Sequence, residues 1–271
     1  MPYEGAHAVV TGGSSGIGRA LVTKLVDRGA EVSIVALDDA DLTQSASDFA
    51  GMGGRVTTHA ADVSVESEVV SALAETTTVH GPCDLLITSA GISRPGYFLE
   101  MPEGSFEHHM AVNYFGTLYA IRAVAPSMIE RSSGSIVAIS SAAGLLGVFG
   151  YSAYGSTKYA VRGLCDVLRT ELTPHGIHVG CVFPTDVDTP QFDAERPHLP
   201  PEALAISGSV KPISADKVAV AILKGVDKRR ANIFTDAGTT VLDRLVRVAP
   251  GLTQRWLDRK VATAAHAQDR P

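Results

Sequence analysis

A tyrosine and a lysine, Tyr154 and Lys158, stand four positions apart near the start of a segment with helical periodicity. Residues at this spacing lie on one face of a helix, about one turn apart. A lysine ammonium close to a phenol favours the phenolate, so we expect the pKa of the tyrosine to fall below its usual value of about 10. Such a tyrosine can donate or accept a proton near neutral pH. The same pair on a surface would do no chemistry.

Two adjacent serines, Ser140 and Ser141, end an apolar run typical of a buried strand, and Ser141 lies 13 positions before Tyr154. Ligands of open α/β sheets bind outside the carboxyl ends of the strands, so these hydroxyls are expected to face one crevice with Tyr154. Ser141 could hydrogen-bond a substrate carbonyl oxygen. Ser140 could be the active one instead, and either could cap a turn or a helix.

A glycine-rich turn, Thr-Gly-Gly-Ser-Ser-Gly-Ile-Gly at 11–18, joins the first predicted strand to the first predicted helix. Glycine lets the backbone turn sharply and approach a pyrophosphate, and the following helix directs free N–H groups at the anion. The pattern also suits a turn without a ligand, but its place after the first strand favours a dinucleotide. The expected contacts here are Gly12, Ser14, Ser15, Gly16, Ile17 and Gly18.

Two later features also favour a dinucleotide. Asp62, after the third predicted strand, could accept a hydrogen bond from an adenine amino group, or it could cap the next helix, as could Ser64. Ala90 and Gly91, after the fourth strand, would let the backbone pass close to the cofactor, although an ordinary turn has the same composition. We also expect cofactor contacts from Val63, Pro184, Thr185, Val187 and Thr189.

The choice between NAD and NADP depends on charge at the end of the second strand. A 2′-phosphate requires Arg or Lys, whereas a free ribose diol requires a carboxylate. Residues 35–39, Val-Ala-Leu-Asp-Asp, include no basic residue, and Asp38, Asp39 and Asp41 would repel a phosphate. Arg19 is a poorly placed counter-ion. Local charge therefore favours NAD, with Asp38 among its contacts.

Short apolar runs alternate with longer amphipathic segments along the chain. Parallel strands need long crossover connections, so this alternation predicts an α/β fold, a single-domain doubly wound parallel sheet of the Rossmann type with helices on both faces. The predicted strands are 7–11, 31–36, 55–59, 85–88, 135–140, 177–183 and 232–234. The predicted helices are 17–28, 39–50, 64–78, 105–131, with a kink expected at Pro126, 153–172 and 214–228.

The longest stretch without predicted regular structure is 185–212, which carries five prolines and indicates a substrate-binding loop. Its apolar residues suggest a hydrophobic substrate. Residues 241–260 are amphipathic and basic and should form two helices divided at Pro250. They could pack on the domain edge or a partner subunit, cover an apolar substrate, or contact a membrane surface. We therefore expect a catalytic domain at 1–240, a helical extension at 241–264 and a frayed tail at 265–271.

Composition excludes several classes of protein. The 271 residues are 45% hydrophobic, which rules out disorder for most of the chain. A net charge of −6 argues against a nucleic-acid partner. The cysteines, Cys83, Cys165 and Cys181, are too far apart to suggest a metal site or a disulfide, and they indicate a cytoplasmic protein. No segment approaches the roughly 20 apolar residues of a membrane span, and the start does not resemble a signal peptide.

The combination of motifs resembles the short-chain dehydrogenase/reductase family over about residues 5–235. The resemblance rests on 11–18, Asp62, Ala90-Gly91, Asn113, Ser141 and Tyr154-x-x-x-Lys158. It implies that Tyr154 is the general acid in reduction and the base in oxidation, while Lys158 lowers its pKa and binds the nicotinamide ribose. Ser141 would orient the carbonyl, and Asn113 would hold a water in a proton relay to Lys158. Relatives pair the two long helices, here 105–131 and 153–172, which implies a homodimer or homotetramer.

A narrower resemblance is to the 3-ketodihydrosphingosine reductases, which use NADPH. It is carried by 144–147, 149–154, 161–164, 184–190, 206–207 and 211–212. It implies a hydrophobic long-chain ketone as substrate. The sequence therefore predicts an NAD- or NADP-dependent oxidoreductase of a ketone or secondary alcohol. A steroid or other lipid-alcohol dehydrogenase is one alternative, and a non-catalytic dinucleotide sensor or scaffold is another.

Overall fold

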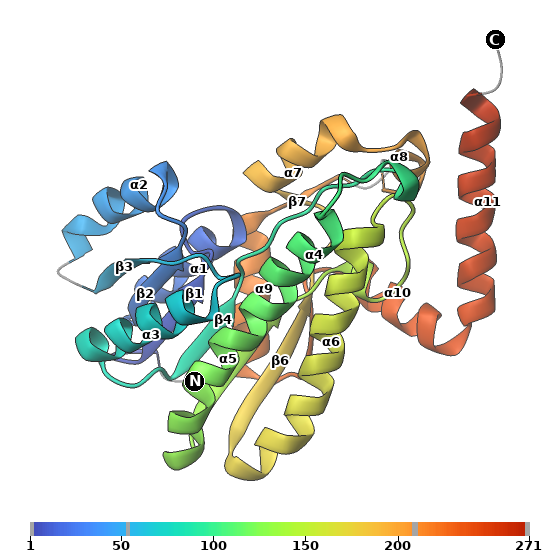
Figure 1. Cartoon of the computed structure of the whole chain (residues 1–271). Helices are drawn as coiled ribbons and strands as arrows, with labels where there is room; N and C mark the ends of the chain where they lie inside the picture. Colours follow the sequence, from blue (N-terminus) through green and yellow to red (C-terminus); the bar gives the residue numbers. More distant parts are fainter. Residues whose placement is uncertain (1–2, 53–54, 208–210, 269–271) are drawn as a thin grey trace.

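A parallel sheet of seven strands forms the centre of the protein in the computed structural model, which describes residues 3–52, 55–207 and 211–268. The strands are β1 (His7–Thr11), β2 (Glu31–Ala36), β3 (Val56–Ala60), β4 (Leu85–Thr88), β5 (Gly134–Ile139), β6 (Ile177–Phe183) and β9 (Asn232–Phe234). Their order, β3-β2-β1-β4-β5-β6-β9, reverses between β1 and β4 (Figure 1). The predicted doubly wound fold is confirmed, and the reversal places a ligand crevice at the carboxyl ends of β1 and β4.

Helices cover both faces of the sheet, so its strands consist of nearly continuous apolar residues. On one face lie α1 (Gly16–Val26), α2 (Ala40–Phe49) and α9 (Ala215–Asp227). On the other lie α3 (Glu66–His80), α4 (Ser105–His109), α5 (Gly116–Glu130) and α6 (Ser152–Leu172). Every position of β1 and β6 is buried. The core thus fixes the strand ends from which the pocket residues emerge.

The helix predicted over 105–131 contains a π-helical segment, Met110–Phe115, between α4 and α5. Segments of this kind occur frequently at functional sites. The irregular segment lies at Asn113, and α5 continues through Pro126. A kink at Pro126 stays a prediction.

The segment predicted as an irregular loop, 185–212, is largely regular where the structure describes it. It contains β7 (Val187–Asp188), α7 (Pro190–Glu195), a 3₁₀ turn and α8 (Pro201–Ser207), and β7 pairs with β8 (Ile213–Ser214). Proline is well suited to the first turn of a helix because the missing N–H would have no partner there. The prolines at 190 and 201 begin helices, and reading them as loop residues was wrong. Residues 208–210 lie outside the described residues.

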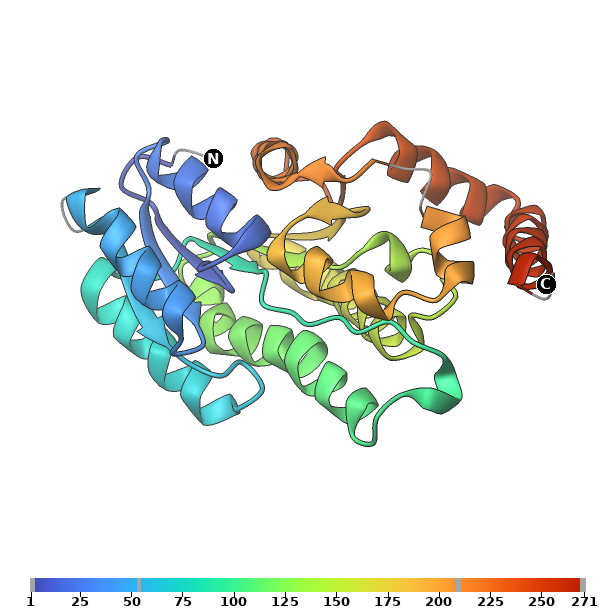
Figure 2. The same ribbon diagram turned by 90° about the horizontal axis from the view of Figure 1, so that it is seen from above.

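Two further helices, α10 (Ala237–Val248) and α11 (Pro250–Gln268), extend to one side of the sheet (Figure 2). They divide at Pro250 as predicted, and α11 packs on α8. The Asp236 carboxylate accepts a hydrogen bond from the Thr239 amide at 2.8 Å and so begins α10 four residues earlier than expected. Residues 265–268 are helical where a frayed tail was predicted, and 269–271 are outside the described part. No helix in the described ranges is long and apolar enough to span a membrane. The division of the chain at residues 240 and 264 stays a prediction.

Candidate active site

The glycine-rich turn between β1 and α1 is a backbone structure that side chains would destroy. A Cβ on Gly12, whose φ is +65°, would lie 2.7 Å from the backbone of Ala90. A Cβ on Gly18 would lie 2.0 Å from the Gly12 carbonyl oxygen. Glycine at position 12 therefore lets the loop after β4 approach, and glycine at position 18 lets α1 pack against its own turn.

The start of α1 directs amide groups toward the crevice. The N–H groups of Gly16, Ile17 and Gly18 have no carbonyl acceptor within the helix, because it begins at Gly16. Together with the positive end of the helix dipole they form a site for a phosphate group. The residues present therefore fit a dinucleotide that lays its pyrophosphate across this turn.

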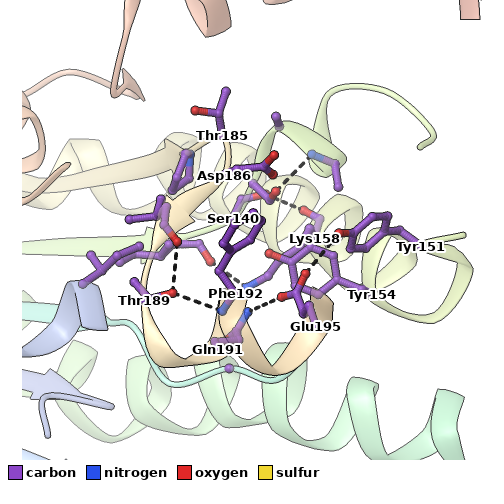
Figure 3. Close-up of a pocket in the computed structure, with 18 of the residues that line it drawn as sticks. Ser140, Tyr151, Tyr154, Lys158, Thr185, Asp186, Thr189, Gln191, Phe192 and Glu195 are labelled. Atoms are coloured by element: carbon purple, nitrogen blue, oxygen red, sulfur yellow. Dashed lines mark hydrogen bonds between the residues drawn. The ribbon is translucent and has the colours of Figure 1, made fainter. Parts of the chain in front are cut away.

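A cavity of about 360 Å³ begins at this turn and continues past α6 to residues of α10 and α11. Figure 3 shows part of its lining, including Tyr154 and Lys158. Most of the predicted site residues line it, namely Gly12, Ser15, Gly16, Ile17, Ala90, Gly91, Ser141, Tyr154, Lys158, Pro184, Thr185, Val187 and Thr189. Six predicted residues do not line it, namely Ser14, Gly18, Asp38, Asp62, Val63 and Asn113. The cavity thus joins the glycine turn to the tyrosine and lysine, as the order of motifs predicted.

Ser141 and Tyr154 are hydrogen-bonded to each other at the middle of the cavity. Burial raises the pKa of Tyr154 well above its ordinary value, and the hydrogen bond from Ser141 lowers it by a smaller amount. The predicted fall in this pKa is wrong for this structure, because the cost of burying a phenolate exceeds the stabilisation by its neighbours. Tyr154 is therefore a protonated phenol in the cavity.

Lys158 lies one helical turn further along α6, almost completely buried. Its ammonium donates to the Ile139 carbonyl oxygen at 3.0 Å and lies 5.3 Å from the centre of the Tyr154 ring. Burial lowers the pKa of Lys158 to about 8. It still carries its charge near neutral pH, so a cation stands directly beside the tyrosine ring.

The two adjacent serines have different partners. Ser140 donates its hydroxyl to the backbone carbonyl of Lys158 at 2.8 Å and so fastens α6 to the end of β5. Ser141 bonds Tyr154, and its oxygen also accepts from the Ala143 amide at 3.1 Å. Only Ser141 combines a capping bond with a contact to the tyrosine, which favours it as the carbonyl-binding serine.

Asn113 lies behind the cavity wall in the π-helical segment and is 1% exposed. Its amide nitrogen donates to the Ile92 carbonyl and the Thr157 hydroxyl, both at 3.0 Å, and its oxygen accepts from the Ile92 amide at 2.8 Å. A Cβ on Gly91 would lie 3.2 Å from that oxygen and 3.6 Å from the Lys158 ammonium. Asn113 therefore ties the loop after β4 to α6; its role in a proton relay stays a prediction.

The residues predicted at the adenosine end are spread over the ends of β2 and β3. The Asp62 carboxylate accepts from the Ser64 amide at 2.8 Å and from the Ser64 hydroxyl at 2.7 Å, while α3 begins only at Glu66. Asp38 is exposed, and Asp39 caps α2 by accepting from an amide at 3.0 Å. The contacts predicted for Asp38 and Asp62 with a cofactor stay predictions.

Sequence reasoning missed five polar residues of the cavity, namely Ser89, Tyr151, Asp186, Gln191 and Glu195. Tyr151 donates its hydroxyl to one oxygen of Glu195 at 3.1 Å, and Gln191 donates to the other at 3.0 Å (Figure 3). Burial, with Glu195 nearby, raises the pKa of Asp186 to about 6. The signal that could have revealed α7 is Thr189 followed by a proline, a capping residue before a favoured first helical position.

A model of the short chain dehydrogenase family matches residues 6–199, more than half of the chain. The chain belongs to this family. The 3-ketodihydrosphingosine reductase of Dictyostelium discoideum is 37% identical to it over 268 residues, which cover 92% of this chain and 79% of the relative.

Two solved short chain dehydrogenases share the fold over nearly their whole length. One, from Burkholderia phymatum in complex with NAD, has a TM-score of 0.83 and 25% identity, with 93% of this chain and 96% of that chain covered. Another, from Burkholderia cenocepacia in complex with NADP, has a TM-score of 0.80 and 25% identity, with 95% and 99% covered. This short chain dehydrogenase is therefore an NAD(P)-dependent oxidoreductase acting on CH–OH and C=O groups, as predicted.

Proposed function

We propose that this dehydrogenase reduces the ketone of a long-chain base, in the manner of the 3-ketodihydrosphingosine reductases. The observation that carries the proposal is the cavity, which places Ser141, Tyr154 and Lys158 between the glycine turn and an apolar end. That end is lined by Leu146, Val148, Phe192, Ile206, Leu242 and Trp256. A hydrocarbon chain gains free energy by leaving water for such a surface. The name of the Dictyostelium relative points to the same class of substrate.

Proton transfer in this proposal starts from a protonated tyrosine. The nicotinamide, when bound, supplies the hydride to the carbonyl carbon. Ser141 donates a hydrogen bond to the carbonyl oxygen, and Tyr154 gives that oxygen its proton as negative charge develops there. The high pKa of Tyr154 keeps the proton in place until the oxygen becomes more basic than a phenolate. Lys158 stabilises the phenolate that remains, because its ammonium lies beside the ring.

For the cofactor, we propose NAD as the preferred dinucleotide. Leu37, at the end of β2, is 55% exposed and offers a 2′-phosphate no positive charge. Arg19 forms an ion pair with Asp48 and donates to the Ser45 hydroxyl at 2.9 Å, so its charge is already neutralised on α2. A free ribose diol needs no such charge.

The test is an assay of the purified protein with 3-ketodihydrosphingosine and, separately, a ketosteroid, each with NADH and with NADPH. Oxidation of the reduced nicotinamide is followed by absorbance. We expect turnover of the long-chain ketone, faster with NADH, at a kcat/KM at least tenfold above that for the steroid. Faster turnover of the steroid would support the alternative lipid-alcohol dehydrogenase. Absence of turnover with every ketone, alongside dinucleotide binding, would support the non-catalytic sensor.

The helices α10 and α11 support a peripheral membrane contact. Val248, Leu252 and Trp256 are exposed, and Val248 is 85% exposed. Four exposed arginines, Arg244, Arg247, Arg255 and Arg259, stand among them. Apolar side chains beside basic ones suit an anionic lipid surface. Because Trp256 also lines the cavity, a lipid substrate would enter directly from the bilayer.

Co-sedimentation with phosphatidylserine vesicles tests this contact. We expect binding to fall when Leu252 and Val248 are both changed to Asp, while turnover of a short, water-soluble ketone stays unchanged. Equal sedimentation of both proteins would contradict the contact. Cytoplasmic placement stays a prediction.

A homo-oligomer through α5 and α6 is a further proposal, supported by exposed apolar side chains on this face. Phe115 precedes α5, and Tyr159 and Val167 lie on α6; all three are exposed. Light scattering behind a sizing column would measure the mass. A monomer at micromolar concentration would contradict the pairing.

A further inference from the structure

Glu195 is a buried carboxylate whose partners are neutral. Only 7% of it is exposed, and its two oxygens accept from the Tyr151 hydroxyl and the Gln191 amide. Among the described ion pairs none includes Glu195. Burying a charge without an opposite charge is costly. Lys158 acts on Glu195 electrostatically from the same cavity but forms no ion pair with it, so the carboxylate has no cation in direct contact among the described side chains.

Asp186 faces the same cavity from the segment after β6 (Figure 3). Its carboxylate also lacks an ion-pair partner among the described side chains, and burial beside Glu195 raises its pKa. Both carboxylates act electrostatically on Tyr154, whose ring lies 5.8 Å from that of Tyr151. The two acids thus lie close to the atom that delivers the proton.

Charge in this cavity is unbalanced for a neutral substrate. Lys158 is the single Lys or Arg among the lining residues that the structure describes, against two carboxylates. Two negative charges near Tyr154 disfavour the oxyanion that forms during reduction, so an uncharged ketone would react at a disadvantage. An ammonium on the carbon next to the carbonyl would lie between the acids and the reacting oxygen. It would pair with the carboxylates and stabilise the developing alkoxide.

We propose that Glu195 and Asp186 form an ammonium subsite, which selects ketones carrying a protonated amine on the carbon adjacent to the carbonyl. This inference rests on the proposed function, since it explains which part of a long-chain base distinguishes it from other hydrophobic ketones. Tyr151 and Gln191 hold the Glu195 carboxylate in position. The apolar end of the cavity then receives the chain.

The experiment compares 3-ketodihydrosphingosine with the same long-chain ketone lacking the amine, in the wild type, in Glu195→Gln and in Asp186→Asn/Glu195→Gln. Glutamine retains an acceptor for Tyr151, so Glu195→Gln preserves the local packing. For the amino ketone we expect kcat/KM to fall roughly 10- to 100-fold in the double variant, because charged hydrogen bonds are lost. For the ketone without the amine we expect kcat/KM to rise, because two negative charges near the developing oxyanion are removed. The control is Asp193→Asn, on the solvent side of α7, which should leave both substrates unchanged.

Binding is measured separately from turnover through the fluorescence of Trp256, the single tryptophan, which lines the cavity. Sphinganine should bind the wild type more tightly than the corresponding alcohol without an amine, and the double variant should bind both equally. Equal affinity in the wild type, or an equal loss of kcat/KM for both ketones, would overturn the subsite while the proposed reductase activity stands. Absence of turnover together with selective amine binding would overturn the proposed reaction and leave the subsite intact.

Discussion

The cofactor end of the cavity is made of backbone, whereas the substrate end is made of side chains. At the first, Gly12 and Gly18 bring β1, α1 and the loop after β4 within contact distance, with no room for a Cβ. At the second, Glu195 on α7 accepts side-chain hydrogen bonds from Gln191 on the same helix and from Tyr151, the residue before α6. A backbone site recognises what all dinucleotides share, and a side-chain site can change its substrate by single substitutions.

Substitution of Tyr154, where the two ends of the cavity meet, should cause the largest loss of activity. In Tyr154→Phe the proton donor is absent while the ring and both ends of the cavity remain. We expect kcat to fall at least roughly 100-fold and the Kd of the dinucleotide to stay within threefold. Tyr159→Phe, an exposed position on the same helix, is the control. Turnover retained in Tyr154→Phe would remove the tyrosine from its proposed role.

The backbone character of the cofactor end is tested by Gly18→Ala. The added Cβ would lie 2.0 Å from a backbone oxygen, so α1 or the turn must shift. We expect the free energy of unfolding to fall by about 3 kcal/mol and dinucleotide affinity to fall with it. In Gly163→Ala, in the middle of α6 with open space around it, the free energy of unfolding should instead rise by up to about 1 kcal/mol. If urea titrations gave the same change in the free energy of unfolding for Gly18→Ala and Gly163→Ala, the close backbone packing at Gly18 would not be what matters.

Substitution of Lys158 tests whether its buried charge, where the two ends of the cavity meet, destabilises the fold. The pKa of Lys158 falls from 10.5 to about 8 on burial. The unfolded chain therefore binds the proton more tightly between these pH values. At pH 7 the buried charge lowers the free energy of unfolding by about 3 kcal/mol. Lys158→Met also loses one hydrogen bond, worth about 1 kcal/mol. We therefore expect the free energy of unfolding of Lys158→Met to exceed that of the wild type by about 2 kcal/mol at pH 7.

That gain should shrink as pH rises from 8 to 10.5, because the wild type loses its penalty when the lysine deprotonates in both states. Denaturant titrations across this range measure the difference. If the difference in the free energy of unfolding between Lys158→Met and the wild type did not change with pH, the buried charge would not be its cause. Turnover should be lost in Lys158→Met at every pH.

The smallest effect is expected outside the cavity, at Leu37 just after β2, where a side chain would meet the ribose of the cofactor. Leu37→Arg would supply a positive charge for a 2′-phosphate, and we expect kcat/KM with NADPH to rise roughly fivefold relative to NADH. Leu37→Gln, which adds no charge, is the control. An equal rise in the kcat/KM ratio of NADPH to NADH in both variants would show that residue 37 acts through its shape and not through its charge.

The cofactor end could be predicted from the sequence because its signals are local. The glycine spacing and the apolar runs of β1, β4 and β6 lie within a few residues of each other, and these strands were predicted with their observed bounds. The pairing of Tyr154 with Lys158 on one helix face is similarly local.

The substrate end could not be predicted because its geometry depends on distant contacts. Glu195 on α7 meets Tyr151, the residue just before α6, across 44 positions of sequence, and no local pattern indicates that contact. The pKa of Tyr154 was predicted in the wrong direction because burial is decided by the whole chain. Asn113, in the π-helical segment, likewise bonds Ile92 and Thr157, which lie 21 and 44 positions away in the sequence.

Lys158 is attached to the sheet at both of its ends. Ser140 holds its backbone carbonyl, and the carbonyl of the preceding residue, Ile139, holds its ammonium. The anchors belong to β5 and the residue directly after it, and neither lies in α7, α8, α10 or α11. The position of the cation beside the proton donor therefore depends on contacts with β5, and a displacement of the outer helices would leave both of these contacts in place.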